Sequence, residues 1–239
     1  MSAVLECPFA NINEPIVVNN PGKCPFHAHI TPIQNLNKSV QLNIKWGEHQ
    51  TSADQAALLA DIGGGDRIRE LTTRFYARAF EDNHIKEFFF LDDGATAHGK
   101  RLADWIIQKM GGEGEPWTDS GRWGMRQPTH HAAWHSAKRP SHRQGQRFKL
   151  DDCRIWMRLH FWAARECGLA DHTPFWEWYV QFIEHFIAFY ERAAPPYAHE
   201  DAEWSAYQAN IDLYTEQGNL MLDVIGKTSV LRTLMSRRS

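Results

Sequence analysis

The sequence predicts an all-α domain that follows an irregular N-terminal tail and precedes an extra C-terminal helix. From Ala53 onward, apolar residues recur at helical spacing, and clusters of glycine or proline separate the periodic runs. Before that point, five prolines within the first 32 positions exclude a continuous helix. We therefore expect a mostly irregular extension over residues 1–52, a helical domain over 53–194 and a helical extension over 195–239.

The first expected helices flank a glycine cluster. Residues 53–62 form a helix that stops at three glycines, and Asp66 caps the next one. This second helix carries apolar side chains at helical spacing, namely Ile68, Leu71, Phe75 and Ala79. A corner of three phenylalanines (88–90) separates it from an amphipathic helix over 98–110, which two glycines close.

The second half of the chain predicts two long core helices. Residues 125–135 are ambiguous and give a short helix at most, and a basic loop over 138–147 follows. Asp151 or Asp152 caps the first core helix, and a Thr-Pro pair opens the second, which a Pro-Pro pair stops. Beyond it, an amphipathic pattern predicts the C-terminal helix: Trp204, Tyr207, Ile211, Tyr214 and Leu222.

Composition narrows the class of protein. Basic and acidic side chains nearly balance, 26 against 29, which argues against a nucleic-acid partner because phosphate neutralisation needs an excess of Lys and Arg. Apolar runs are too short for a membrane span, no signal peptide is visible, and four cysteines make no disulfide scaffold at this length. We therefore expect a cytoplasmic protein with no membrane partner. The 10 Trp and 13 Phe suit a flat ligand, or simply a packed core.

Three histidines are the first candidates for chemistry. His131 and His135 are four residues apart, so on a helix their imidazoles share one face and can share a metal. Neither an HExxH motif nor a nearby CxxC pair accompanies them. Three interpretations stay open for this group, which includes His130: surface histidines, a zinc site, or a single axial ligand of haem iron.

Six features occur in an order that is typical of a known family. A glycine-rich corner leads to a helix with an adjacent Phe75-Tyr76, and a phenylalanine pair at 88–89 follows. Then come a helix that carries Trp105 and ends in two glycines, a Met-Arg pair just before the histidines, and Trp156. This order resembles the truncated haemoglobins, most closely their second group, and the resemblance covers about residues 55–192.

The resemblance implies a globin-like helical sandwich around a haem pocket, with haem b bound through a proximal histidine. In this family a bulky apolar side chain usually follows the ligand by three residues, which favours His131 because Trp134 follows it. His130, followed by Ala133, is the alternative, and His135 is third. The connection to the next helix is longer than is usual in the family, so the register stays open by one residue or more.

The resemblance also places side chains on the opposite face of the haem. Tyr76 donates a hydrogen bond to the bound gas, and His98 donates a second one or binds the iron itself when no gas is present. Trp156 points its indole N–H at the gas, while Leu102 and Phe89 line the pocket. From the residues alone, Tyr76 and Trp156 also read as core rings, and His98 as a solvated histidine near a helix end.

Two further segments bear on haem. Basic side chains of the loop are candidates to pair with the haem propionates, although a solvated loop is the simpler interpretation: Lys138, Arg139, His142, Arg143 and Arg147. Cys7 and Cys24 each open a Cys-Pro-Phe triplet, which resembles the haem-regulatory motif or simply forms a turn.

Under the resemblance, the chain binds dioxygen, nitric oxide or carbon monoxide, and an enzymatic role would be nitric oxide dioxygenation or weak peroxidase activity. Sustained dioxygenation needs a reductase, and none is recognisable in the sequence. Two other classes stay open: a helical interaction protein without a cofactor, and a zinc-binding helical domain. The zinc site would use His131 and His135, joined by His27 or His29.

Overall fold

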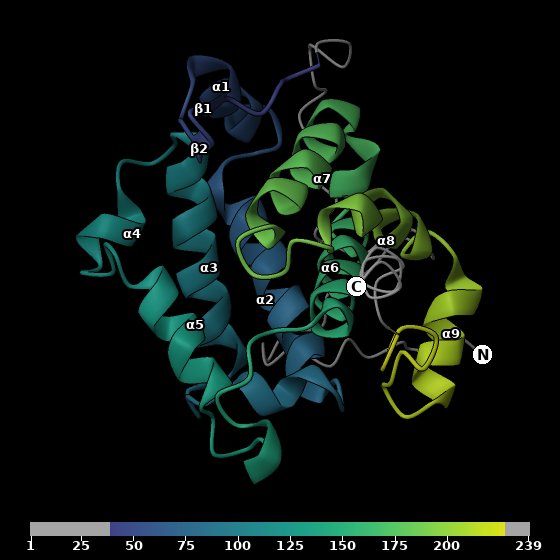
Figure 1. Ribbon diagram of the computed structural model, residues 1–239. Coiled ribbons are helices and arrows are strands. Elements are labelled where there is room, and N and C mark those ends of the chain that lie inside the picture. Colours follow the sequence, from purple (N-terminus) through teal and green to yellow (C-terminus); the bar gives the residue numbers. More distant parts are fainter. Residues whose placement is uncertain (1–38, 228–239) are drawn as a thin grey trace, which may run out of the picture. The chain divides into compact units, whose positions relative to one another are not determined.

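The computed structural model describes residues 39–227, which form an all-α, globin-like architecture as the sequence predicts (Figure 1). These residues belong to one compact unit, Gln34–Ser239. The first half contains α1 (Ala53–Asp61), α2 (Gly65–Glu81), the 3-10 helix η2 (Ile85–Phe88), α3 (Gly94–Met110) and α4 (Pro116–Asp119). The second half contains α5 (Arg126–Trp134), α6 (Leu150–Glu166), α7 (Thr173–Ile187), α8 (Ala198–Trp204) and α9 (Gln208–Glu216). No helix of the described part is both long and apolar enough to cross a membrane.

A short hairpin precedes α1, inside the segment that the sequence predicts to be mostly irregular. Its strands β1 (Ile44–Lys45) and β2 (Glu48–His49) pair antiparallel, with Ile44 opposite His49. Strands of two residues are too short to produce an alternating hydrophobic pattern, which explains why the sequence gives no sign of them. The expectations for the early cysteines and histidines, Cys7, Cys24, His27 and His29, lie outside the described residues.

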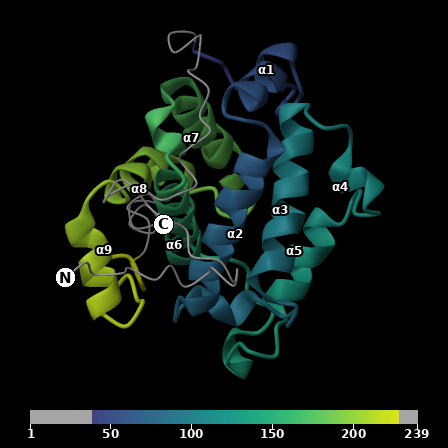
Figure 2. The ribbon, with the colours of Figure 1, turned by 180° about the vertical axis from the view of Figure 1, so that it is seen from behind.

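Helices α2 and α3 pack closely side by side, as both views show (Figures 1 and 2). Gly99 permits this approach, because a Cβ atom there would lie only 2.9 Å from the Cα of Thr73 on α2. α2 begins after Gly64, whose φ of 82° favours glycine, so the expected cap, Asp66, lies in the first turn instead. The close pair fixes the position of Tyr76 on α2 relative to His98 on α3.

Helix α6 is buried along most of its length and carries a large part of the core. Its cap is Lys149 rather than Asp151 or Asp152. Asp152 serves instead as the acceptor of the Lys149 backbone N–H, at 2.7 Å. α7 starts at the Thr-Pro pair as expected, after His172.

The C-terminal segment forms two short helices, α8 and α9, rather than the single helix that the sequence predicts. α8 packs on α6 and α7. Its Asp201 is buried and accepts hydrogen bonds from Arg154 and Arg158 of α6, at 2.7–3.1 Å. This ionic contact ties the segment to the helix that carries Trp156.

Candidate functional site

Several of the expected site residues lie where two parts of the core meet. One part is formed mainly by α3, α6 and α7, and the other by α2, η2, α6 and the C-terminal segment. Leu102, Phe148 and Trp156 pack against both parts, yet each stays half-buried. Large apolar side chains that join two core clusters and still carry accessible surface are what an apolar ligand would cover.

Large side chains, rather than a close backbone approach, connect helix α5 to the rest of the fold. Among the described elements it makes no extensive backbone approach to another helix, whereas α2 and α3 do. Both views show α5 alongside α3 (Figures 1 and 2). On its inner face, His130 and Trp134 contact Phe148, with ring centroids 5.8 and 5.9 Å apart. His130 and Trp134 therefore lie on the side of α5 that faces Phe148.

Tyr76, Phe89 and His98 form one aromatic group between α2, η2 and α3. Their ring centroids lie 5.6 Å apart for Tyr76 and Phe89, and 5.2 Å for Tyr76 and His98. Phe80 stacks on Phe89 at 4.6 Å. Leu102 follows His98 by one helical turn on α3. The structure therefore brings together Tyr76, Phe89 and His98, three of the residues that the sequence assigns to the gas-binding side.

The side chain of Tyr76 keeps some exposed surface, although its hydroxyl is largely shielded from water. Its side chain is half-buried, and burial raises the pKa of its phenol to about 12. Its hydroxyl has no hydrogen-bond partner among residues 39–227, and neither has the indole N–H of Trp156. Tyr76 therefore stays protonated at neutral pH and keeps its O–H free to donate to a ligand.

His98 has one ring nitrogen occupied and one free. Its Nδ1 lies 3.0 Å from the carbonyl oxygen of Gly94 and 3.0 Å from a carboxylate oxygen of Asp93. Both partners only accept hydrogen bonds, so the proton is on Nδ1. Burial lowers the pKa of His98, and the Arg101 charge adds to the decrease. The neutral ring therefore presents the lone pair of Nε2.

His130 has the same arrangement on α5. Its Nδ1 lies 2.7 Å from the carbonyl oxygen of Arg126, one turn earlier, and the hydroxyl of Tyr190 lies 3.2 Å from the same nitrogen. Because a carbonyl only accepts, Nδ1 carries the proton and Nε2 carries the lone pair. Burial lowers the pKa of His130 to about 4, so the ring is neutral at physiological pH.

His131 and His135 lie on the exposed side of the same segment. Their rings contact each other at 4.8 Å, as the four-residue spacing predicts, and His131 also contacts Trp134 at 5.5 Å. Neither imidazole makes a hydrogen bond within the described part of the chain. His131 therefore lacks the orienting contact that His130 has.

Residues 39–227 place three potential metal ligands together at a different position. Atoms of His84, Asp151 and Asp152 lie within 4.8 Å of one another. Their polar atoms are already used within the fold, with Nε2 of His84 2.8 Å from Asp152 and a second oxygen of Asp152 on the backbone of Lys149. The histidine pair proposed for zinc, His131 and His135, gains no third ligand from the described residues.

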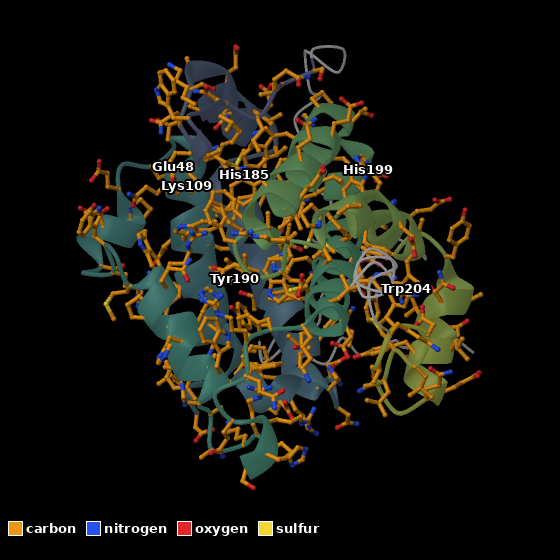
Figure 3. The ribbon with its side chains drawn as sticks, viewed as in Figure 1. Glu48, Lys109, His185, Tyr190, His199 and Trp204 are labelled. Carbon is orange, nitrogen blue, oxygen red and sulfur yellow. The ribbon has the colours of Figure 1, made fainter. Side chains whose placement is uncertain are left out.

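Arg126 and Tyr190 belong to the site, although the sequence pattern marks them only as a motif residue and a core ring. The Arg126 guanidinium lies 5.0–5.8 Å from four ring centroids: Trp105, Phe186, Phe189 and Tyr190. Tyr190 follows α7 and lies between α5 and α6 (Figure 3). Its hydroxyl lies 3.2 Å from Nδ1 of His130. No local pattern predicts this, because the contact with His130 spans 60 residues.

Several basic side chains of the loop over residues 138–147 already pair with carboxylates of the fold. Arg139 is buried and lies 3.1 Å from one carboxylate oxygen of Glu87, while Arg143 lies 2.7 Å from the other. Lys138 pairs with Asp92 at 2.5 Å. Arg147 lies over the ring of Trp134 at 5.2 Å, and among residues 39–227 it has no carboxylate partner. It is therefore the arginine of the loop that is most available to an external anion.

Comparison with known families identifies one relationship. Residues 57–138 match the family model of bacterial-like globins. The matched segment runs from α1 to the start of the basic loop, and so it holds the expected iron ligands and all the expected pocket residues except Trp156. No curated protein and no solved structure matches the chain. The match supports a globin relationship for the segment that contains α2, α3 and α5.

The chemistry of these side chains fits haem, the group that globins normally bind through a histidine. Haem needs a neutral imidazole with a free nitrogen, and His130 supplies it. It also needs large apolar surfaces, which Leu102, Phe148 and Trp156 offer. The free O–H of Tyr76 is suited to a polar ligand on the iron.

Proposed function

We propose that the chain is a truncated-haemoglobin-type protein that binds haem b through Nε2 of His130 and takes up dioxygen, nitric oxide or carbon monoxide. One observation carries the proposal: His130 is a neutral imidazole whose Nδ1–H is held by the Arg126 carbonyl at 2.7 Å, which leaves Nε2 free. Metal-binding histidines are characteristically oriented by such a bond from the other nitrogen. His131, which the sequence spacing favours, is exposed and has no such bond, so we assign the ligand to His130.

The chain's own residues would set how tightly the gas is held. Haem supplies the iron that binds the gas and changes redox state. Tyr76 and Trp156 have free O–H and N–H groups that donate to a polar ligand, while Leu102 and Phe89 exclude water. Because donated hydrogen bonds slow ligand release, we favour sensing or redox work over bulk transport. The redox candidates are nitric oxide dioxygenation, with an external reductase, and weak peroxidase activity.

The visible absorption spectrum tests the proposal. Purified protein supplemented with hemin should give a sharp Soret band that shifts after dithionite and again after carbon monoxide. Hemin without protein, in the same buffer, is the control and should give only the broad band of unligated hemin. A protein that takes up no hemin would contradict the proposal and favour a helical interaction protein without a cofactor. Zinc in the purified protein, with no iron, would favour a zinc-binding domain.

Replacing Tyr76 by Phe should speed dioxygen release. The change removes one donated hydrogen bond and keeps the ring, and such a bond is worth about 0.5–1.5 kcal/mol, or roughly a 2- to 10-fold increase in the dissociation rate. Stopped-flow displacement of dioxygen by carbon monoxide measures this rate. The dissociation rate of carbon monoxide, a less polarised ligand, should change little. An unchanged dioxygen rate would remove Tyr76 from the site.

His98 should be a pH-dependent sixth ligand of ferric iron. Its Nδ1 proton is held by Gly94 and Asp93, so its Nε2 binds iron rather than donating to the gas. Because burial lowers the pKa of His98, the neutral ring persists to a pH below the ordinary histidine range and is lost as the pH falls through that lowered pKa. We expect a low-spin spectrum at neutral pH that becomes high-spin on acidification. His98→Leu should be high-spin throughout; a low-spin spectrum in that variant would exclude His98 as the ligand.

A further inference from the structure

Behind Trp156, a stack of oxidisable and basic side chains continues into the core. Trp156 and His160 are one turn apart on α6, and their ring centroids lie 3.9 Å apart. Nδ1 of His160 lies 2.6 Å from the hydroxyl oxygen of Tyr179 on α7. Both His160 and Tyr179 have no exposed surface. The three side chains therefore form one continuous contact from the site to the centre of the core.

The protonation of this pair follows from its partners. The Tyr179 hydroxyl has no other acceptor among the described residues, so it donates to Nδ1 of His160. The proton of the neutral imidazole is then on Nε2, which is buried without a hydrogen-bond partner. Burial lowers the pKa of His160 and raises the pKa of Tyr179, so both are neutral. An apolar ring at this position would fill the same space without leaving a buried N–H unsatisfied, so packing alone does not explain His160.

The same stack continues toward the surface. Tyr179 contacts Phe161 with ring centroids 6.3 Å apart, and Phe161 contacts Trp176 at 5.5 Å. Trp176 is half-buried and lies beneath the guanidinium of Arg165 at 4.5 Å. Tryptophan and tyrosine are thus present at both ends and in the middle of a chain of rings in contact.

We propose that Trp156, His160 and Tyr179 form an internal one-electron donor to the haem site, with Trp176 as its outlet. This inference rests on the proposed haem function: bound haem would supply the reduction of one hydrogen peroxide to two waters, which consumes two electrons and two protons. Trp156 would provide one of these electrons and become an indole radical cation. Tyr179 then reduces Trp156: the electron passes to the indole, and the phenolic proton crosses the 2.6 Å hydrogen bond to Nδ1 of His160. A neutral tyrosyl radical and an imidazolium remain.

The buried hydrogen bond makes the transfer reversible. The proton stays on His160, beside the radical, because no other described group contacts either polar atom. A one-electron reductant such as ascorbate, acting at Trp176, would reduce the tyrosyl radical of Tyr179 to the phenolate. The proton on His160 would then return to the phenolate oxygen. The site could then survive peroxide without losing Tyr76 or Trp156 to irreversible oxidation.

Electron paramagnetic resonance of the full-length, hemin-loaded protein, frozen after mixing with peroxide, tests this proposal. Wild type should give a tyrosyl signal that narrows when the tyrosine rings are deuterated. Tyr179→Phe should lose most of this signal, and His160→Phe, which keeps a ring but removes the proton acceptor, should replace it by a tryptophanyl signal. Tyr214→Phe is the matched control, because Tyr214 is also buried but donates to Asp82 and lies outside the stack.

The outcomes separate this inference from the function on which it rests. Failure to take up hemin would overturn both. A normal Soret band and carbon monoxide shift, with a tyrosyl signal that Tyr179→Phe leaves unchanged, would overturn the electron-donor proposal alone. Loss of the signal in Tyr214→Phe as well as in Tyr179→Phe would also overturn it, since a general loss would not depend on the stack.

Discussion

Replacing His130 by glycine should abolish the imidazole-ligated haem spectrum, and added imidazole should restore it. The change removes the proposed iron ligand and leaves a space of the size of the lost ring. Losing only the hydrogen-bond partner of a metal ligand typically costs about 10- to 100-fold in metal affinity, so loss of the ligand itself should lower haem affinity by at least that factor. Titration with hemin, followed by the Soret band, measures the affinity with and without imidazole.

His131→Ala provides the matched control for this prediction. The two histidines are adjacent on α5, but His131 is exposed and lacks the contact with Arg126. We expect wild-type affinity and spectrum in His131→Ala. If that variant loses the spectrum while His130→Gly retains it, the ligand is the one that the sequence spacing favours. Loss in both variants, without rescue by imidazole, would mean that α5 is not the iron-binding helix.

The adjacent histidines show where sequence reasoning stops. A bulky side chain three residues later favours His131, yet on a helix positions three and four residues apart lie on nearly the same face. Trp134 is therefore compatible with either histidine. The contacts that favour His130 are the Arg126 carbonyl on its Nδ1 and the ring of Phe148, which lies outside the helix. A spacing rule cannot contain that information.

The long helices could be predicted because their apolar residues recur at helical spacing, and these residues are the ones buried in the core. α2, α3 and α7 each have one buried side, α6 is buried on almost every side, and all four lie close to the expected ranges. α5 was ambiguous for the opposite reason: Ala133 is its one buried residue, so it has no hydrophobic stripe. A short helix with a single buried residue gives a weak sequence signal, because the signal is the periodic recurrence of apolar side chains.

The C-terminal segment shows the other limit of sequence reasoning. An amphipathic pattern predicts one helix there, but Tyr207 and Leu222 are exposed and the segment is divided into α8 and α9. One of its attachments to the core is the buried carboxylate of Asp201, which the sequence alone does not distinguish from a surface carboxylate. The partners of Asp201, Arg154 and Arg158, are 47 and 43 residues away, so no local pattern reveals the contact.

Replacing Asp201 by alanine should therefore be among the most destabilising single changes in this chain. The carboxylate is buried and accepts hydrogen bonds from Arg154 and Arg158, residues that are only 9% and 3% exposed. Removing one partner of a buried ion pair leaves uncompensated charge and typically costs about 3–5 kcal/mol. Urea unfolding followed by far-ultraviolet circular dichroism measures the loss as a lower midpoint.

Asp223→Ala tests whether the destabilisation comes from the loss of a buried ion pair or only from the loss of one negative charge. Asp223 also pairs with Arg158, at 2.6 Å, but its side chain is 53% exposed. Water screens such a pair, so its loss should cost only about 0–1 kcal/mol. Equal destabilisation by the two variants would show that net charge, rather than the buried contact, governs stability. A large effect of Asp201→Ala alone would mean that the buried ionic contact between α8 and α6, rather than net charge, stabilises the fold.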